Sequence, residues 1–155
     1  LPDSRENGYS CQEDGMIGLG CGARSYTRDL HYSSRYSVSP RGITGIIDEY
    51  IMKSRESFFY ADYGFLLTGD EQKRRFIIKS LLKKQGLDKH RYTRLFGSTP
   101  GEDFDMLNLL RTLEYLEEDD GRFMLTEKGT AYSDAIGPLL ISSEVKKRME
   151  SYVFT

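Results

Sequence analysis

Residues 67–88 read LTGDEQKRRFIIKSLLKKQGLD, and this stretch decides the fold of the C-terminal half. Its isoleucines and leucines recur at helical spacing, which predicts an amphipathic helix. Thr68 and Glu71 have the spacing of a capping box at the start of that helix. Gly86 supplies the left-handed residue that commonly follows a helix end. We therefore expect a helix that begins after Thr68 and runs to Gln85.

The boundaries of the next two helices are equally clear. Asp88 is expected to cap a short helix that Gly97 ends. Thr99 and Pro100 have the pattern of an N-cap followed by proline at the first helical position. The helix that follows is expected to reach about Glu117. Four of its leucines are expected to face inward: Leu107, Leu110, Leu113 and Leu116.

A turn and two further helices complete this half. Residues 119–122 read DDGR and predict a turn between two short strands, the second of which includes residues 123–125. Thr126 is expected to cap a fourth helix, which Pro138 breaks before a last helix ends near Glu150. Three helices, a hairpin and another helix predict a winged-helix-like domain in an α+β fold that is mostly α.

The first 66 residues have weaker patterns. Residues 15–19 predict one strand, and residues 20–42 a long loop rich in Ser, Tyr and Arg. A helix is expected over residues 43–54, followed by an extended segment over residues 57–67. The helix has an apolar stripe that consists of Ile43, Ile46, Ile47, Tyr50 and Ile51.

Composition excludes several classes of protein. The chain has 155 residues, a net charge of −2 and a pI near 5.8. Its longest apolar run, residues 16–23, has three glycines among eight residues and is too short to span a membrane, and residues 1–10 have no leader pattern. Cys11 and Cys21 are expected to be free thiols in the cytoplasm, with a disulfide or a shared metal site as the alternative. Because the chain starts with Leu1, we expect a piece of a longer protein.

Charge is unevenly distributed. Residues 67–99 carry nine basic and three acidic side chains, whereas residues 100–121 carry one basic and eight acidic. Arg75 lies on a basic stripe of the first predicted helix, which is either a solvated face or an anion site; Lys79 and Lys83 complete this stripe. Arg74 instead shares the apolar stripe, so we expect it to face inward and to need a buried partner or an anionic ligand.

A glycine-rich segment precedes the predicted long loop. Residues 17–23 read IGLGCGA, which has GxGxG spacing and not the GxGxxG of a dinucleotide-binding loop. Three glycines in five positions free the backbone of side chains, so either a ligand approaches the loop or the loop is a structural turn. His31 is expected to be a surface or hydrogen-bonded histidine. The sequence has no nucleophile–base pair and no metal-ligand set, so we assign it no catalytic or metal residue.

Three blocks of sequence resemble the C-terminal part of oxygen-independent coproporphyrinogen III oxidase, a radical S-adenosylmethionine (SAM) enzyme of haem biosynthesis. The first includes Gly8-Tyr9, Gly18-Leu-Gly20 and Ala23. The second runs from Leu67-Thr68 through Arg74-Arg75 to Leu87-Asp88, and the third is Leu125-Thr126-x-Lys128-Gly129.

This resemblance implies three regions: residues 1–40 as the last strand and loop of a truncated radical SAM barrel, residues 41–66 as a connector, and residues 67–155 as the winged-helix-like domain. In the family, SAM and a [4Fe–4S] cluster drive the oxidative decarboxylation of coproporphyrinogen propionates to vinyl groups. The implied SAM-binding residues are Gly18, Gly20, Ala23 and Arg24. Arg74 and Arg75 are candidates for contact with the tetrapyrrole substrate, by our inference from charge.

The resemblance also sets limits. The CxxxCxxC cluster motif is absent, so we expect this chain alone to be inactive, to hold no cofactor, and to meet SAM and substrate only through the missing barrel. Glu6-Asn7 and Arg24 depart from the family pattern, which leaves a related haem-handling radical SAM protein open. A non-enzymatic winged-helix interaction module is a further alternative. We expect binding to neither DNA nor membranes.

Overall fold

The structure is a computed structural model that describes residues 15–35 and 37–151. The chain divides into an N-terminal unit, which runs to Gly69 and includes Ser151, and a C-terminal unit, Asp70–Glu150. Helices and two small antiparallel sheets make up these units, which confirms the predicted α+β class. Within the described ranges, no helix is long and apolar enough to cross a membrane.

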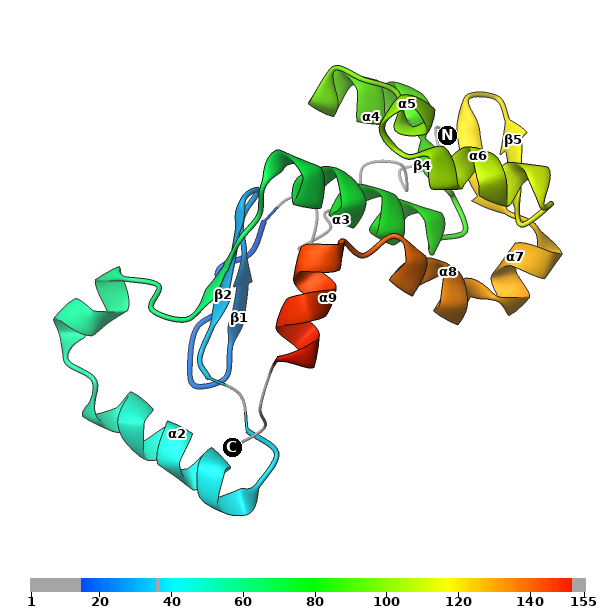
Figure 1. Ribbon diagram of the computed structural model, residues 1–155. Coiled ribbons are helices and arrows are strands. Elements are labelled where there is room, and N and C mark those ends of the chain that lie inside the picture. The colour runs from blue at the N-terminus through cyan, green and yellow to red at the C-terminus, as the bar shows by residue number, and fades with distance from the viewer. Residues whose placement is uncertain (1–14, 36, 152–155) are drawn as a thin grey trace, which may run out of the picture. The chain divides into compact units, whose positions relative to one another are not determined.

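Three short strands form the sheet of the N-terminal unit. They are β1 (Arg24–Tyr26), β2 (Leu30–Ser33) and β3 (Gly64–Leu66), with β2 in the middle and all pairs antiparallel (Figure 1). Tyr26 pairs with His31 across β1 and β2, and their rings make an edge-to-face contact with centroids 4.8 Å apart. His31 is therefore half-buried in the sheet and is not a loop residue.

The sequence missed this hairpin. The strand predicted at residues 15–19 is wrong, since Met16 makes only one isolated bridge, and the loop predicted over residues 20–42 contains both β1 and β2. The turn depends on Thr27, whose N–H donates to the Leu30 carbonyl at 2.8 Å and whose Oγ1 accepts from the Leu30 N–H at 3.0 Å. A turn closed by a threonine hydroxyl lacks the glycine or proline that marks most hairpins.

Helix α2 (Pro40–Met52) confirms the helix predicted over residues 43–54. It begins earlier because Ser39 caps it by accepting from the Gly42 N–H at 3.1 Å, with proline at the first position. None of its residues is buried. Several members of its apolar stripe are instead largely exposed, namely Ile43, Ile47 and Ile51.

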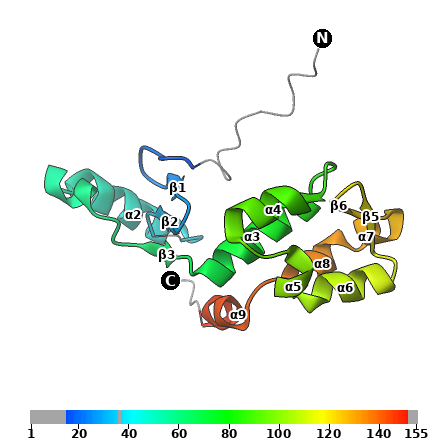
Figure 2. The same cartoon turned by 90° about the horizontal axis from the view of Figure 1, so that it is seen from above.

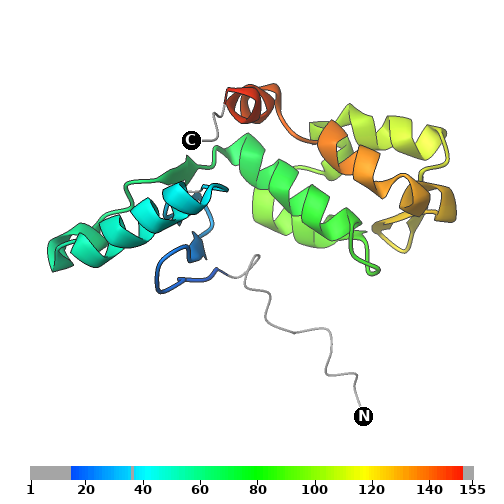
Figure 3. The same ribbon diagram turned by 90° about the horizontal axis from the view of Figure 1, so that it is seen from below.

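The segment after α2 is only partly extended. A short 3₁₀ helix, η1 (Arg55–Phe59), overlaps the start of the extended segment predicted over residues 57–67, and only β3 within that range is a strand. The Tyr50 and Phe58 rings meet edge to face at 5.3 Å. Figure 3 shows α2 and the short helical turn that follows it.

The C-terminal unit packs helices around a second antiparallel sheet (Figures 1 and 2). Its helices are α3 (Gly69–Leu81), α4 (Lys89–Phe96), α5 (Pro100–Asp103), α6 (Asp105–Thr112), α7 (Glu127–Ala131), α8 (Ser133–Leu139) and α9 (Ser143–Glu150). Its strands are β4 (Leu87–Asp88), β5 (Leu116–Asp119) and β6 (Arg122–Leu125), with β6 in the middle.

Most predicted boundaries in this unit are confirmed. Asp88 caps α4 by accepting from a first-turn N–H at 2.8 Å, and Gly97 ends it with a φ of 76°. Thr99 and Glu102 form a capping box at α5, and Thr126 caps α7. These caps are local in sequence, so they can be read before the tertiary structure is known.

The predicted hairpin is also confirmed. Strands β5 and β6 pair from Leu116↔Leu125 to Asp119↔Arg122. Asp120 and Gly121 join them with φ values of 41° and 77°. Two consecutive left-handed residues make the turn that matches the twist of a two-stranded ribbon.

Two helix ends differ from the prediction. Helix α3 ends at Leu81 and not at Gln85, although Gly86 is left-handed as expected, with a φ of 69°. Pro138 lies inside the last turn of α8 and does not begin a helix; α9 begins later, at Ser143.

The third predicted helix is broken. Phe104 has an extended backbone, with φ −140° and ψ 95°, and separates α5 from α6. Its side chain is buried, so this backbone places an aromatic ring in the core at the cost of one helical turn. Helix α6 then ends at Thr112, which leaves Leu113 at the C-cap and 47% exposed, contrary to the inward position predicted for it.

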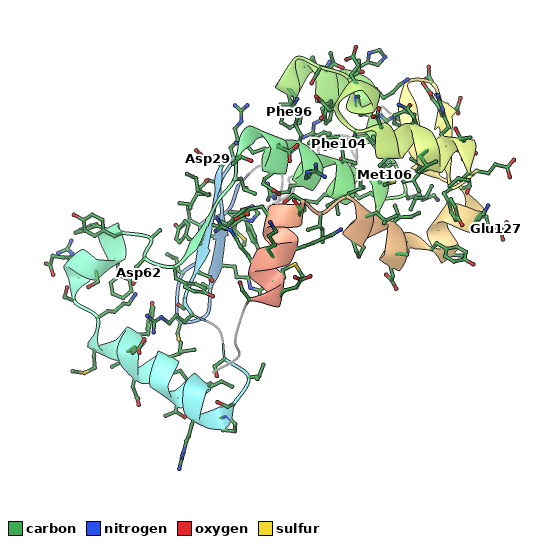
Figure 4. All side chains as sticks on the ribbon, viewed as in Figure 1. Asp29, Asp62, Phe96, Phe104, Met106 and Glu127 are labelled. Carbon is green, nitrogen blue, oxygen red and sulfur yellow. The ribbon has the colours of Figure 1, made fainter. Side chains whose placement is uncertain are left out.

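One apolar core holds the C-terminal unit together. Its buried members come from α3, the sheet and the helices that follow: Ile77, Leu81, Leu87, Tyr92, Phe104, Leu107, Leu110, Leu116, Phe123, Ile136 and Leu140. Phe96 and Met106, labelled with Phe104 in Figure 4, pack against this core from its edge. The inward positions predicted for Leu107, Leu110 and Leu116 are confirmed.

Candidate functional site

The glycine-rich segment forms a loop between Met16 and β1. Met16 and Tyr26 close its base through two backbone hydrogen bonds of 2.7 and 2.8 Å. The Gly18 N–H donates to the buried Ser25 hydroxyl at 3.1 Å, and a Cβ at Gly18 would lie 2.6 Å from the Arg24 carbonyl oxygen. Glycine at this position is therefore required by the closure of the loop itself.

The tip of the loop is open. Gly20 and Gly22 have φ values of 102° and 76°, and a Cβ built on either would meet no atom within 4 Å. The Ala23 N–H donates back to the Gly20 carbonyl at 3.2 Å, and Arg24 is exposed at the start of β1. The four residues implied as SAM contacts therefore lie together in one loop; the space beside Gly20 is open, whereas the Gly22 N–H donates to the Ser34 hydroxyl at 3.4 Å.

The cysteines decide whether this chain could hold an iron–sulfur cluster. Cys21 is exposed in the same loop, and Cys11 lies outside the described residues. A [4Fe–4S] cluster is held by cysteine thiolates, and a site that leaves one iron open for SAM still takes three. The chain has two cysteines, so its donor set does not fit the cluster.

Arg74 lies in the C-terminal unit and is paired within its own domain. Its Nε donates to Asp70 Oδ2 at 2.7 Å, and its Nη1 donates to the Leu140 carbonyl at 3.0 Å. The guanidinium carbon lies 4.8 Å from the centroid of the Phe104 ring. The inward, paired arginine predicted here is present, but its partner carboxylate is 56% exposed and not buried.

The residues of the predicted basic stripe are partly buried or already interact with other groups. Arg75 and Lys79 are half-buried on α3, and Lys83 is exposed beyond its end. All three interact with other groups of the chain. Arg75 therefore has no geometry that singles it out as a substrate contact.

No sequence pattern predicts the polar network that is centred on Asp103. Its carboxylate accepts from Lys73 Nζ at 2.8 Å, from Tyr92 Oη at 2.7 Å and from the Ser98 hydroxyl. Burial would raise the pKa of Asp103, but these hydrogen bonds outweigh it and hold the pKa below its usual value. Burial, followed by the hydrogen bond to Asp103, raises the pKa of Tyr92. The four residues come from separate helices and loops, so no sequence spacing reveals them.

A corner between α6 and β5 explains part of the third resemblance block. Glu114 has a φ of 62°, which is uncommon for a residue with a side chain. Thr126 Oγ1 donates to the Glu114 carbonyl at 2.7 Å, and Lys128 Nζ donates to the Leu113 carbonyl at 2.9 Å. The two side chains satisfy carbonyls that the end of α6 leaves without helical partners.

Gly129 fits the same corner for a steric reason. A Cβ on Gly129 would lie 2.0 Å from the Tyr115 carbonyl oxygen. Lys128 Nζ also lies 4.4 Å from the centroid of the Tyr115 ring. Threonine, lysine and glycine in this block therefore hold the α6–β5 corner in place, which is a structural role.

Comparison with known proteins agrees with these blocks. Searches of curated proteins and of solved structures gave no match. One protein-family model, described as the HemN C-terminal domain, matches residues 67–132. This segment contains α3 to α7 and both of the resemblance blocks that lie in the C-terminal half. The match confirms the predicted resemblance: residues 67–132 are similar to the C-terminal domain of the HemN-like radical SAM coproporphyrinogen oxidases.

Proposed function

We propose that this chain is the C-terminal part of a radical SAM enzyme of haem biosynthesis that resembles oxygen-independent coproporphyrinogen III oxidase. The match of residues 67–132 to the HemN C-terminal domain carries this proposal. The parent would be a cytoplasmic oxidoreductase that converts coproporphyrinogen propionates to vinyl groups. The chain by itself would be inactive.

We read the C-terminal unit as winged-helix-like. The order α3, β4, α4, α5–α6, β5, β6 supports this reading, as does the sheet order β4-β6-β5. The strand β4 between the first two helices pairs with the second strand of the hairpin, so the hairpin forms the wing. Assignment of residues 1–40 to the end of a barrel rests on the sequence blocks alone, because the strands there pair antiparallel with each other and with β3.

The glycine loop is the proposed SAM contact. Open backbone at Gly20, with Ala23 and Arg24 beside it, supports approach by the nucleoside or amino-acid part of SAM. Gly18 would act through the shape of the loop, because its N–H already bonds to Ser25. When bound, SAM and the cluster supply the radical chemistry; residues of this chain would only orient SAM, and the cluster thiolates would come from elsewhere in the parent.

The proposed contacts with the substrate are Arg74 and Arg75. Arg74 is already engaged by Asp70 and by a backbone carbonyl, so binding a propionate would break those bonds. Arg75 keeps the role of candidate propionate contact on charge alone. A tetrapyrrole would reach either residue only with the barrel in place.

A domain exchange tests this function. Residues 67–150 would replace the corresponding domain of a characterised oxygen-independent coproporphyrinogen III oxidase, and anaerobic formation of protoporphyrinogen would be measured. We expect the chimera to keep at least about a tenth of the rate of the unmodified oxidase. This ratio corresponds to an activation barrier raised by no more than ~1.4 kcal/mol. An unrelated winged-helix domain in the same place is the control and should give no conversion. A folded, cluster-loaded chimera without activity would contradict the proposal.

The second candidate is an interaction module without enzymatic function. The helix that contacts DNA in a winged-helix protein is acidic here. This favours contact with a protein over contact with DNA. Exposed acidic residues on α5, α6 and β5 are Glu102, Asp105, Glu117, Glu118 and Asp119. Because DNA affinity depends on cations that displace counterions, this face opposes DNA binding. A gel shift with mixed duplexes at ~50 mM salt should show no saturable complex; a salt-sensitive complex at micromolar protein would favour a transcription factor.

A further inference from the structure

A hollow of about 360 Å³ opens on the C-terminal unit. It lies between the first turn of α4, the start of α5, the end of α6 and the β5–β6 hairpin. Its charged and ring-bearing lining includes Lys89, His90, Arg111, Glu118 and Phe123, with Thr99 at the edge. None of these residues belongs to the SAM loop or to the proposed substrate contacts.

Glu118 bridges two cations inside this hollow. One carboxylate oxygen accepts from Lys89 Nζ and the other from Arg111 Nη1, the latter at 2.6 Å. Hydrogen bonding from Lys89, followed by that from Arg111, holds the pKa of Glu118 below its usual value despite partial burial. The carboxylate is therefore ionised near neutral pH, and the three side chains together carry one net positive charge.

The two cations have more donors than Glu118 can use. A lysine ammonium has three N–H donors and an arginine guanidinium has five. In the structure, each spends one donor on Glu118. Since Lys89 and Arg111 both line the hollow, the remaining donors are available to a second acceptor there.

The floor of the hollow is apolar. Phe123 is 3% exposed, and Lys89 Nζ lies 5.3 Å from the centroid of its ring. Pro100, which is fully buried, also lines the hollow. A site with an aromatic floor and converging cations suits a ligand that has both an apolar body and an acidic group.

We propose that this hollow binds a small organic carboxylate, whose acidic group lies between Lys89 and Arg111 while its apolar body covers Phe123. A single negative charge matches the one net positive charge of the lining. A dianion such as phosphate would be opposed by Glu118 and by the exposed Asp119 and Asp120 on the same hairpin. The Glu118 carboxylate would compete with the ligand's carboxylate for hydrogen bonds from Lys89 and Arg111.

A titration of the full chain tests the site. Benzoate is the probe, and amide chemical shifts report binding. We expect saturable shifts at residues 89–93, at Thr99 and at Gly101, with a Kd of about 1 mM. Shifts confined to other regions, or no saturation, would overturn the proposal.

Variants separate a ligand site from a purely structural ion cluster. Glu118→Gln removes the competitor and keeps a hydrogen-bonding side chain, so it should tighten benzoate binding by about fivefold. Arg111→Gln should weaken it by a similar factor. Glu117→Gln, at the next position along β5, is the matched control and should change nothing. If Glu118→Gln lowers the melting temperature without tightening benzoate, the cluster is structural only.

Two further arms identify the ligand. Inorganic phosphate should bind more weakly than benzoate, and the reverse order would overturn the choice of a carboxylate. A short peptide with a glutamate beside an aromatic residue distinguishes a partner's side chain from a free acid. Tighter binding of that peptide supports the site and assigns its carboxylate to a protein partner; weaker binding supports a free organic acid.

Discussion

Two helices of equal length behave in opposite ways in this protein. Helices α2 and α3 each have 13 residues and an apolar stripe at helical spacing. Helix α3 buries Ile77 and Leu81 in the core of the C-terminal unit, whereas α2 buries none of its residues. Amphipathic periodicity thus predicts a helix and its apolar face, but not what covers that face.

The two units differ in the same way. Every member of the apolar core belongs to the C-terminal unit. Among the described residues of the N-terminal unit, only Leu67 is a buried apolar side chain, and Ser25 and Ser37 are the buried polar ones. Backbone hydrogen bonds of the sheet and caps hold that unit, and each adds only about 1 kcal/mol of net stability. Stability is therefore concentrated in residues 70–150.

The largest expected effect compares one glycine from each unit. Gly129→Ala would place a methyl group against the Tyr115 carbonyl and should cost more than about 4 kcal/mol in the free energy of unfolding. Gly45→Ala in α2 meets only open space and should gain about 0.5 to 1 kcal/mol. Urea unfolding followed by circular dichroism measures both. Equal effects would show that the α6–β5 corner is as adaptable as the surface of α2.

A pair of core-type residues sharpens the same contrast. Leu107→Ala empties a fully buried site and should cost about 3 kcal/mol. Ile47→Ala removes a side chain that is 42% exposed, so its cost should stay within about 0.5 kcal/mol. The same urea experiment applies. A loss at Ile47 as large as that at Leu107 would mean that the α2 face is covered in solution.

Acid should reveal the Asp103 network. Because the folded-state pKa of Asp103 is lowered, its stabilisation is fully present above its unfolded-state pKa of about 4 and is lost as the pH falls through the folded value. Asp103→Asn should cost about 2 kcal/mol at neutral pH and reduce the slope of stability against pH below about 4. Asp105→Asn, an exposed neighbour, is the control. An unchanged slope in Asp103→Asn would contradict the pairing with Lys73.

The smallest effect concerns Arg74. Its partly buried hydrogen bond to the Leu140 carbonyl and its contact with Phe104 should make Arg74→Ala cost about 1 kcal/mol. The larger loss of about 3 to 5 kcal/mol that follows removal of one partner of a buried ion pair is not expected, because Asp70 is more than half exposed. Arg94→Ala, on the exposed side of α4, should have no measurable effect. A cost above the core substitution at Leu107 would refute this order.

Local signals in the sequence determined much of the C-terminal unit. Caps at Asp88, Thr99 and Thr126, the stop at Gly97, and the DDGR turn act within four or five residues of themselves, so they identify element boundaries without tertiary information. The sequence blocks around residues 67–88 and 125–129 were enough to indicate the HemN relationship, which the family match then confirmed.

Only the tertiary structure decided the rest. Phe104 interrupts the third predicted helix with an extended backbone while its ring lies in the core, and Leu113 is exposed at the C-cap because α6 ends early. The Asp103 network and the Lys89–Glu118–Arg111 cluster join residues up to 30 positions apart, which no local pattern encodes. The β1–β2 hairpin was not predicted, because its turn is closed by the Thr27 hydroxyl and contains no glycine or proline. Helix caps depend on residues that are close in sequence, whereas the burial of a helix or sheet face depends on which distant segment packs against it.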